Sequence, residues 1–364
     1  MTHFFRVTTF LIGLGLAVAG GSAAEAAADH PKLAQDALNK VLRPGYEAFA
    51  TDAKALKEKT AALCAAPSEA GLQDARSAFA AAVKGWSAVE IYQFGPVNRE
   101  HRYERLFFWP DRKGLGLRQV QRAISSKDDS VTSAKTLGQK SVALQGLPAL
   151  EYLLYGNGAE ALAKPDDAGA FRCRFAAAVA DNIATLAQEV AGAWEPDAPF
   201  TKVFLEPGPD DPLYLDPKDV TLELYKAFSG GIERVRDEKL GRALGESAER
   251  ARPRIMPFWQ SGQTFPNMAG NIEAVRKLFV DAEFAEIVAG ESPGVQDSVL
   301  FDLDRVARLL AEEQSPIAEA VTDPNQREKL EALRVGLHSA RETASELIAQ
   351  GAGLNFGFNE GDGD

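Results

Sequence analysis

Apolar residues recur at intervals of three and four along most of the chain, while the strict alternation typical of half-buried strands is scarce. Such spacing gathers apolar side chains on one face of a helix, and that face must be covered by another helix. The sequence therefore predicts an all-α protein. The predicted helices cover residues 32–63, 68–94, 117–124, 146–156, 171–194, 220–235, 266–289, 296–313 and 323–350.

Local signals interrupt this pattern. Pro44 and Gly45 should bend or break the first predicted helix, because proline removes a backbone hydrogen bond. Ser68 is the predicted N-cap of the second helix. Residues 99–116 lack helical periodicity and are rich in aromatic and basic side chains, so we expect an irregular segment there.

The chain has 364 residues, which is more than one hydrophobic core usually serves, so we expect two packed helical bundles. A stretch rich in proline and aspartate separates two helical regions and predicts a linker. The expected organisation is a signal peptide, a bundle, the linker, a second bundle and a flexible tail. Their respective ranges are 1–28, 29–195, 196–219, 220–350 and 351–364.

The amino end is typical of an export signal. Arg6 precedes an apolar run over residues 7–19, and small-residue tripeptides suited to a signal peptidase follow. The alternative is a membrane anchor, but the run is shorter than the roughly 20 residues that span a bilayer. We therefore expect a protein of the periplasm or cell envelope, with no membrane span after cleavage.

Two cysteines, Cys64 and Cys173, are the only ones in the chain. An even pair in an oxidising compartment predicts one disulfide, and the alternative is two buried thiols.

The net charge is −12, and an acidic surface argues against nucleic acid as a partner. It is compatible with attracting cations, although many proteins are acidic for solubility alone.

Candidate chemistry centres on Glu151. Leu147 and Leu154 share its helical face, and a glutamate among leucines must be paired, metal-bound or protonated. Pro148 predicts a kink that frees the carbonyl of Leu144. Glu90 is a second inward carboxylate, because it lies four residues after the apolar Trp86.

The two carboxylates allow two interpretations. They could bind a hard or borderline cation through oxygen, or they could neutralise the arginines of residues 99–105. Only four histidines occur, no HExxH motif is present, and the cysteines lack zinc-ligand spacing. The sequence therefore predicts no catalytic residue.

Several motifs together resemble the imelysin family of bacterial envelope proteins, once catalogued as a metallopeptidase. The motifs are GLPALEYLLYG at 146–156, FWPDRKG at 108–114, RCRFAAAVADNI at 172–183, EKLGRALG at 238–245 and SGQTFPNMAGNI at 261–272. The resemblance implies two packed bundles, an envelope location, a link to iron acquisition and a site around a Gly-x-His-x-x-Glu motif. Gly146 and Glu151 match that motif, whereas Pro148 stands at the histidine position.

From these features we expect a binding or accessory protein for iron or another divalent cation, working with envelope iron-uptake components. Glu151 and Glu90 are the candidate metal ligands, with Arg102, Trp109 and Asp111 at the rim of the site. One alternative is an interaction module in which Glu151 forms a structural ion pair. The other is a metal-dependent peptidase, which the missing histidine disfavours.

Overall fold

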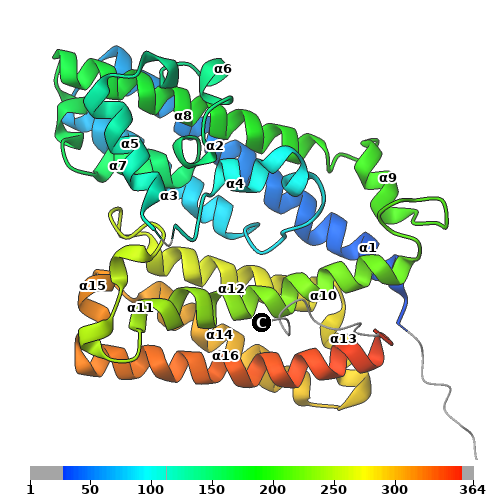
Figure 1. The fold of residues 1–364 in the computed structure, drawn as a ribbon. Coiled ribbons are helices and arrows are strands. Elements are labelled where there is room, and N and C mark those ends of the chain that lie inside the picture. Colours follow the sequence, from blue (N-terminus) through cyan, green and yellow to red (C-terminus); the bar gives the residue numbers. More distant parts are fainter. Residues whose placement is uncertain (1–27, 112, 355–364) are drawn as a thin grey trace, which may run out of the picture.

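The computed structural model describes residues 28–111 and 113–354, and all regular secondary structure in these ranges is helical (Figure 1). The predicted all-α class is thus confirmed. The predicted signal peptide, apart from Ala28, and residues 355–364 of the predicted tail lie outside the described ranges.

The first half packs α2, α3 and α8 side by side, with α7 against them. Its longer helices begin with a capping serine or aspartate where the sequence offers one: the Ser68 hydroxyl accepts the amide of Gly71 at the start of α3. The elements are α1 (His30–Asp36), η1 (Ala37–Leu42), α2 (Arg43–Ala65), α3 (Glu69–Ser87), η2 (Gly95–His101), α4 (Arg102–Leu106), α5 (Leu115–Ser126), η3 (Asp129–Val131), α6 (Ala134–Leu137), η4 (Val142–Leu144), α7 (Leu147–Tyr155), η5 (Ala159–Ala163) and α8 (Asp167–Gly192).

The second half is built around α10, α12, α14 and α16, which pack as a four-helix group (Figure 1). Buried residues of both halves belong to one contiguous core. The elements are α9 (Pro199–Leu205), α10 (Pro217–Glu233), η6 (Arg234–Gly241), α11 (Arg242–Leu244), η7 (Ala248–Arg250), η8 (Pro253–Ile255), α12 (Thr264–Asp281), α13 (Phe284–Glu291), α14 (Val295–Glu312), α15 (Ile317–Ala320) and α16 (Pro324–Gly351).

Pro44 does not break the first helix. The π-helical segment η1 precedes it, and the amide of Arg43 bonds to the carbonyl of Leu38, five residues back. Leu42 and Arg43 keep right-handed helical angles, so the rod runs on into α2 although Pro44 offers no N–H of its own. The widened π-helical turn therefore accommodates the proline, and the helix continues through it.

The predicted linker is partly ordered. Residues 199–205 form α9, and Phe204 is buried with its ring 5.3 Å from that of Trp194. This segment is therefore folded against the first half, and the domain boundaries themselves stay a prediction.

A disulfide joins Cys64 at the end of α2 to Cys173 in α8, with 5.4 Å between the Cα atoms. Within residues 28–111 and 113–354, the helices are too short or too polar to cross a bilayer.

Candidate functional site between the two halves

Glu151 lies on the buried side of α7, and only 5% of it is exposed. Leu147 and Leu154, its predicted neighbours on the same face, are fully buried. The predicted inward orientation of this carboxylate is confirmed.

The Glu151 carboxylate is held by the second half of the chain. Its Oε1 accepts hydrogen bonds from the amides of Gln260 and Ser261 at 2.9 and 2.8 Å, and from the Ser261 hydroxyl at 2.8 Å. These donors lie in the loop that precedes α12. Phe258 in this loop has a φ of 60°, an uncommon conformation for a bulky residue. Two family-like motifs, 146–156 and 261–272, thus meet at one oxygen.

Burial raises the pKa of Glu151 to about 7, although the Ser261 and Gln260 donors favour the ionised form. Among the residues that the structure describes, Glu151 is held by the hydrogen bonds of Gln260 and Ser261 and not by an ion pair, so the alternative of an arginine partner is wrong. Near neutral pH this carboxyl is therefore divided between its acid and its carboxylate form.

Glu151 lines a cavity of about 180 Å³ between the two halves, which we call the Glu151 cavity. The other lining residues from the first half include Trp109, Asp111, Pro148 and Tyr152; Met256 and Trp259 come from the second half. Both Asp111 oxygens accept amides at the start of α5, from Leu115 at 2.7 Å and Gly116 at 2.8 Å. Trp109 and Asp111 line the same cavity as Glu151.

The expected kink at Pro148 is absent. Helix α7 begins at Leu147, so Pro148 occupies its first turn and no helical hydrogen bond is lost. Leu144 belongs to the separate 3₁₀ turn η4. Pro148 instead forms part of the cavity wall.

Gly146 and Arg172 position α7, a role that the sequence did not predict for either residue. A Cβ atom on Gly146 would lie 2.3 Å from the carbonyl oxygen of Leu106, so only glycine allows this backbone contact. The buried guanidinium of Arg172 donates to the carbonyls of Leu153 and Tyr152, at 2.7 and 2.6 Å, and so caps the carboxyl end of α7. Arginine at the start of the RCRF motif was the available signal.

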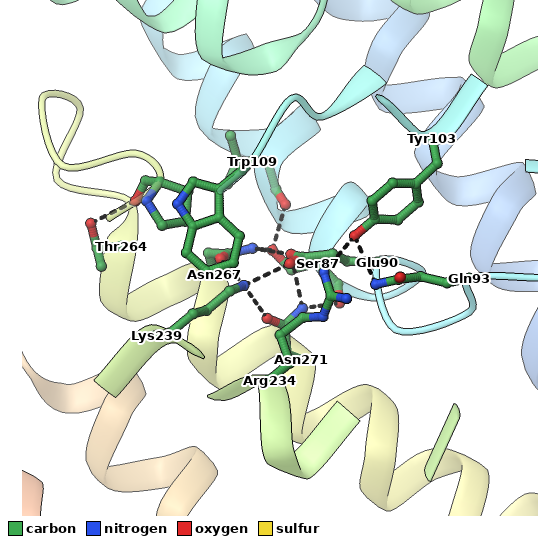
Figure 2. A network of polar contacts seen from close by, with 12 residues as sticks. Ser87, Glu90, Gln93, Tyr103, Trp109, Arg234, Lys239, Thr264, Asn267 and Asn271 are labelled. Atoms are coloured by element: carbon green, nitrogen blue, oxygen red, sulfur yellow. Dashed lines mark hydrogen bonds and ion pairs between the residues drawn. The ribbon is translucent and has the colours of Figure 1, made fainter. Parts of the chain in front are cut away.

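Glu90 is fully buried, but it lies three residues beyond the end of α3 rather than on the helix as expected. Its Oε1 accepts a charge-assisted bond from Lys239 Nζ at 2.7 Å. Asn267 and Asn271 of α12 donate to its Oε2 at 2.8 and 3.1 Å, and their side-chain oxygens accept from Lys239 (Figure 2). The carboxylate and the ammonium are both satisfied in this closed network.

The expectation that Glu90 neutralises the arginines of residues 99–105 is therefore wrong. Its partners come from η6 and α12, more than 140 positions away in sequence. Burial alone would raise the pKa of Glu90, but Lys239 and Arg234 outweigh it and lower the pKa. Burial lowers the pKa of Lys239 to about 8, although the neighbouring Glu90 carboxylate acts to raise it. The available signal was the pair of asparagines four residues apart on the apolar face of α12.

Trp109 connects the two buried glutamates. Its ring lines the Glu151 cavity, and its centroid is 5.7 Å from Lys239 Nζ, within cation–π range. Its Nε1 donates to the carbonyl of Ile255 at 2.9 Å. Figure 2 shows the indole beside the Lys239 side chain.

Arg102 does not line the Glu151 cavity. It bonds to Glu189 of α8 at 3.0 Å and to Glu100 at 3.2 Å, on the surface of the first half. Its predicted place at the rim of the Glu151 site is wrong, because the 3₁₀ turn before α4 directs it toward α8.

The donor set at Glu151 is a poor fit for a bare metal ion. In the described part of the chain, three or more acidic, histidine or cysteine side chains do not gather at any one place to hold a cation. Asp111 already accepts two amides, and the Glu90 carboxylate faces an ammonium. A cation at Glu151 would need most of its ligands from elsewhere.

Comparisons with known proteins agree on one family. A family model described as imelysin, which carries a peptidase label, matches residues 42–343. Iron-regulated protein A of Synechococcus elongatus is 24% identical over 214 residues, covering 58% of this chain and 54% of that protein. The chain thus spans about half the length of that relative.

Two solved structures share the fold. An imelysin-like protein from Psychrobacter arcticum has a TM-score of 0.71 at 20% identity, with 90% of this chain and 97% of that one covered. A structure from Parabacteroides distasonis, provisionally named an iron-regulated protein A precursor, has a TM-score of 0.72 at 13% identity, with coverages of 88% and 95%. At these identities the structures establish the fold alone.

Proposed function

The chain belongs to the imelysin family, and from this premise we propose that it is an exported binding or accessory protein that serves iron acquisition. Its ligand site is the Glu151 cavity. The observation that carries the proposal is a buried carboxyl group, with a pKa raised to about 7, in the wall of a cavity that both halves build. The iron-regulated name of the Synechococcus relative supports the link to iron.

An envelope location is part of this proposal. The amino-terminal segment has the composition of an export signal, and the Cys64–Cys173 disulfide suits an oxidising compartment. Envelope iron-uptake components are the proposed partners.

Binding rather than catalysis fits the side chains around the cavity. Its lining residues supply the Glu151 carboxyl group, the Asp111 carboxylate that accepts two amides of α5, and aromatic rings. These lining residues do not pair a nucleophile with an oriented base. A peptidase would need such a pair or a metal-bound water. Chelator-sensitive cleavage of a peptide library, lost in Glu151→Ala, would overturn this part of the proposal.

Since Glu151 is the main ligand that the cavity offers, a cation would bind there with most of its water ligands retained, and this cation arm of the proposal predicts pH-dependent binding. A cation must displace the proton from Glu151, and a carboxyl with a pKa of about 7 is mostly protonated at pH 6 and mostly ionised at pH 8. We expect the affinity for Mn²⁺, or for Fe²⁺ without oxygen, to rise about tenfold over this interval.

Calorimetric titration of the processed protein measures this affinity. Glu151→Gln should abolish saturable binding, while the exposed Glu160→Gln is the matched control and should bind like wild type. Without saturable binding in the wild type, or with equal binding in Glu151→Gln, the cation site is refuted. A Glu151→Gln variant that changes stability alone would show that the carboxyl serves only to hold the loop of Gln260 and Ser261.

A further inference from the structure

A second hollow lies beside the Glu151 cavity. Its volume is about 560 Å³, and Ile255 lines both spaces. We call it the arginine hollow, and its lining residues are Arg242, Gly245, Glu246, Arg250, Arg252 and Ile255. These arginines take no part in the Glu151 or Glu90 sites.

The arginine hollow is basic, although the molecule as a whole is acidic. Three guanidinium groups face one carboxylate, in a chain whose net charge is −12. Arg250 pairs with Glu246, and both side chains are more than 70% exposed, so this pair is weak in water. Arg242 lies 3.7 Å from Glu238. Arg252 has no acidic partner among the residues that the structure describes.

The backbone beneath the arginines is held in place. Arg327 of α16 donates to the carbonyls of Leu244 and Gly245 at 2.7 and 3.2 Å. The amide of Arg252 donates to the carbonyl of Ala243 at 2.8 Å, which closes the loop on itself. The backbone on either side of Arg250 and Arg252 is therefore held in place, and these two arginines line the hollow together with Arg242 of α11.

We propose that the arginine hollow is a binding site for an oxyanion of the carboxylate or phosphate class. A guanidinium presents its donors in a planar fork that matches either group, and several forks in one hollow suit a multiply charged anion. Arg254, two residues after Arg252, lines the Glu151 cavity. Its guanidinium carbon lies 5.7 Å from the centroid of the Trp259 ring. The basic surface thus continues from one hollow to the other. This inference rests on the arginines alone and does not need the proposed cation site.

Two probes separate the sources of such an anion: citrate, a tricarboxylate, and inorganic phosphate. Each is titrated calorimetrically into the processed full chain at low ionic strength. We expect saturable binding of at least one, and the tighter probe identifies the class. Raising NaCl to about 0.5 M should weaken binding, because exposed charges are then screened within a few ångströms.

The double variant R250Q/R252Q should weaken anion binding about tenfold or more, since hydrogen bonds to a charged group are lost. Both residues are exposed, so the fold should survive, and a thermal melt checks this. The control R305Q/R308Q removes two exposed arginines of α14 and should bind anions like wild type.

Failure to bind either anion, or equal binding by R250Q/R252Q and wild type, would overturn the inference. The same double variant should retain the Mn²⁺ affinity of the wild type, because neither arginine touches Glu151. Wild-type protein that binds Mn²⁺ but neither anion would refute this inference alone, and wild-type protein that binds an anion but no Mn²⁺ would refute the cation site alone.

Discussion

At the scale of single residues, the two buried glutamates are stabilised by different means. Glu151 accepts backbone amides and a hydroxyl, and burial raises its pKa to about 7. Glu90 faces Lys239 and two asparagines, and its pKa is lowered. The first can therefore change its charge near neutral pH, whereas the second stays ionised to hold the halves together.

The raised pKa of Glu151 makes stability depend on pH. The folded chain holds a proton that the unfolded chain, with an ordinary value of 4.5, releases. This contribution is fully present below pH 4.5 and is lost as pH rises through about 7. At about 1.4 kcal/mol per pH unit, the loss is about 3 kcal/mol.

Urea unfolding at pH 5 and pH 8 measures the effect. Glu151→Gln resembles the protonated form and should reduce the drop in unfolding free energy by about that amount. Equal pH dependence in the variant and the wild type would contradict the assigned protonation.

Lys239 should be far more important for stability than a surface lysine. Lys239→Met leaves the Glu90 carboxylate buried without its ammonium, and we expect a loss of about 3–5 kcal/mol. Adding Glu90→Gln should restore part of it. The control Lys226→Met removes an exposed lysine paired with Glu223 and should change stability by less than about 0.5 kcal/mol. Chemical unfolding of all four proteins tests this, and a tolerated Lys239→Met would show that the pair does not form.

At the scale of elements, irregular helical turns place the key groups. The π-helical segment η6 carries Lys239 into the interior, and η1 absorbs Pro44. Gly230 and Gly231 lie within the continuous helix α10. The second of them is needed for packing rather than for flexibility.

Adjacent glycines in α10 should therefore respond in opposite directions to alanine. A Cβ on Gly231 would lie 2.7 Å from Val275 Cγ2, so Gly231→Ala should cost about 1–3 kcal/mol by overpacking the contact with α12. A Cβ on Gly230 would meet no atom within 4 Å, so Gly230→Ala should stabilise the protein by about 0.5–1 kcal/mol. Thermal unfolding compares the two, and a destabilising Gly230→Ala would contradict this account of the helix contact.

At the scale of the whole molecule, polar groups couple the halves. Glu151 and Glu90 belong to the first half, while Ser261, Lys239, Asn267 and Asn271 belong to the second. The Cys64–Cys173 bond constrains the first half, because it closes a loop across 109 positions.

Removing this disulfide should lower the unfolding free energy by up to about 5 kcal/mol in the loop-entropy model. Cys64→Ala/Cys173→Ala and the reduced wild type should unfold at similar urea concentrations, below that of the oxidised wild type. Reductant should leave the double variant unchanged. Equal stability of oxidised and reduced wild type would show that the bond does not constrain the fold.

Sequence periodicity alone determined the helical class, most helix positions and the burial of Glu151. These follow from local rules, because a helix fixes which side chains share a face over a few residues. Even so, the π turns escaped prediction, since they depend on how a helix packs along its whole length.

Only the tertiary structure decided what each carboxylate meets. The donors to Glu151 are more than 100 positions away, and Lys239 is 149 positions from Glu90. Such pairings depend on how two helical layers are stacked, and side-chain spacing within one helix contains no information about that. For the same reason the sequence misplaced Arg102, whose partner Glu189 lies 87 positions away. The arginine hollow depends on how residues 242–255 fold, and Arg327 of α16 holds part of that backbone in place.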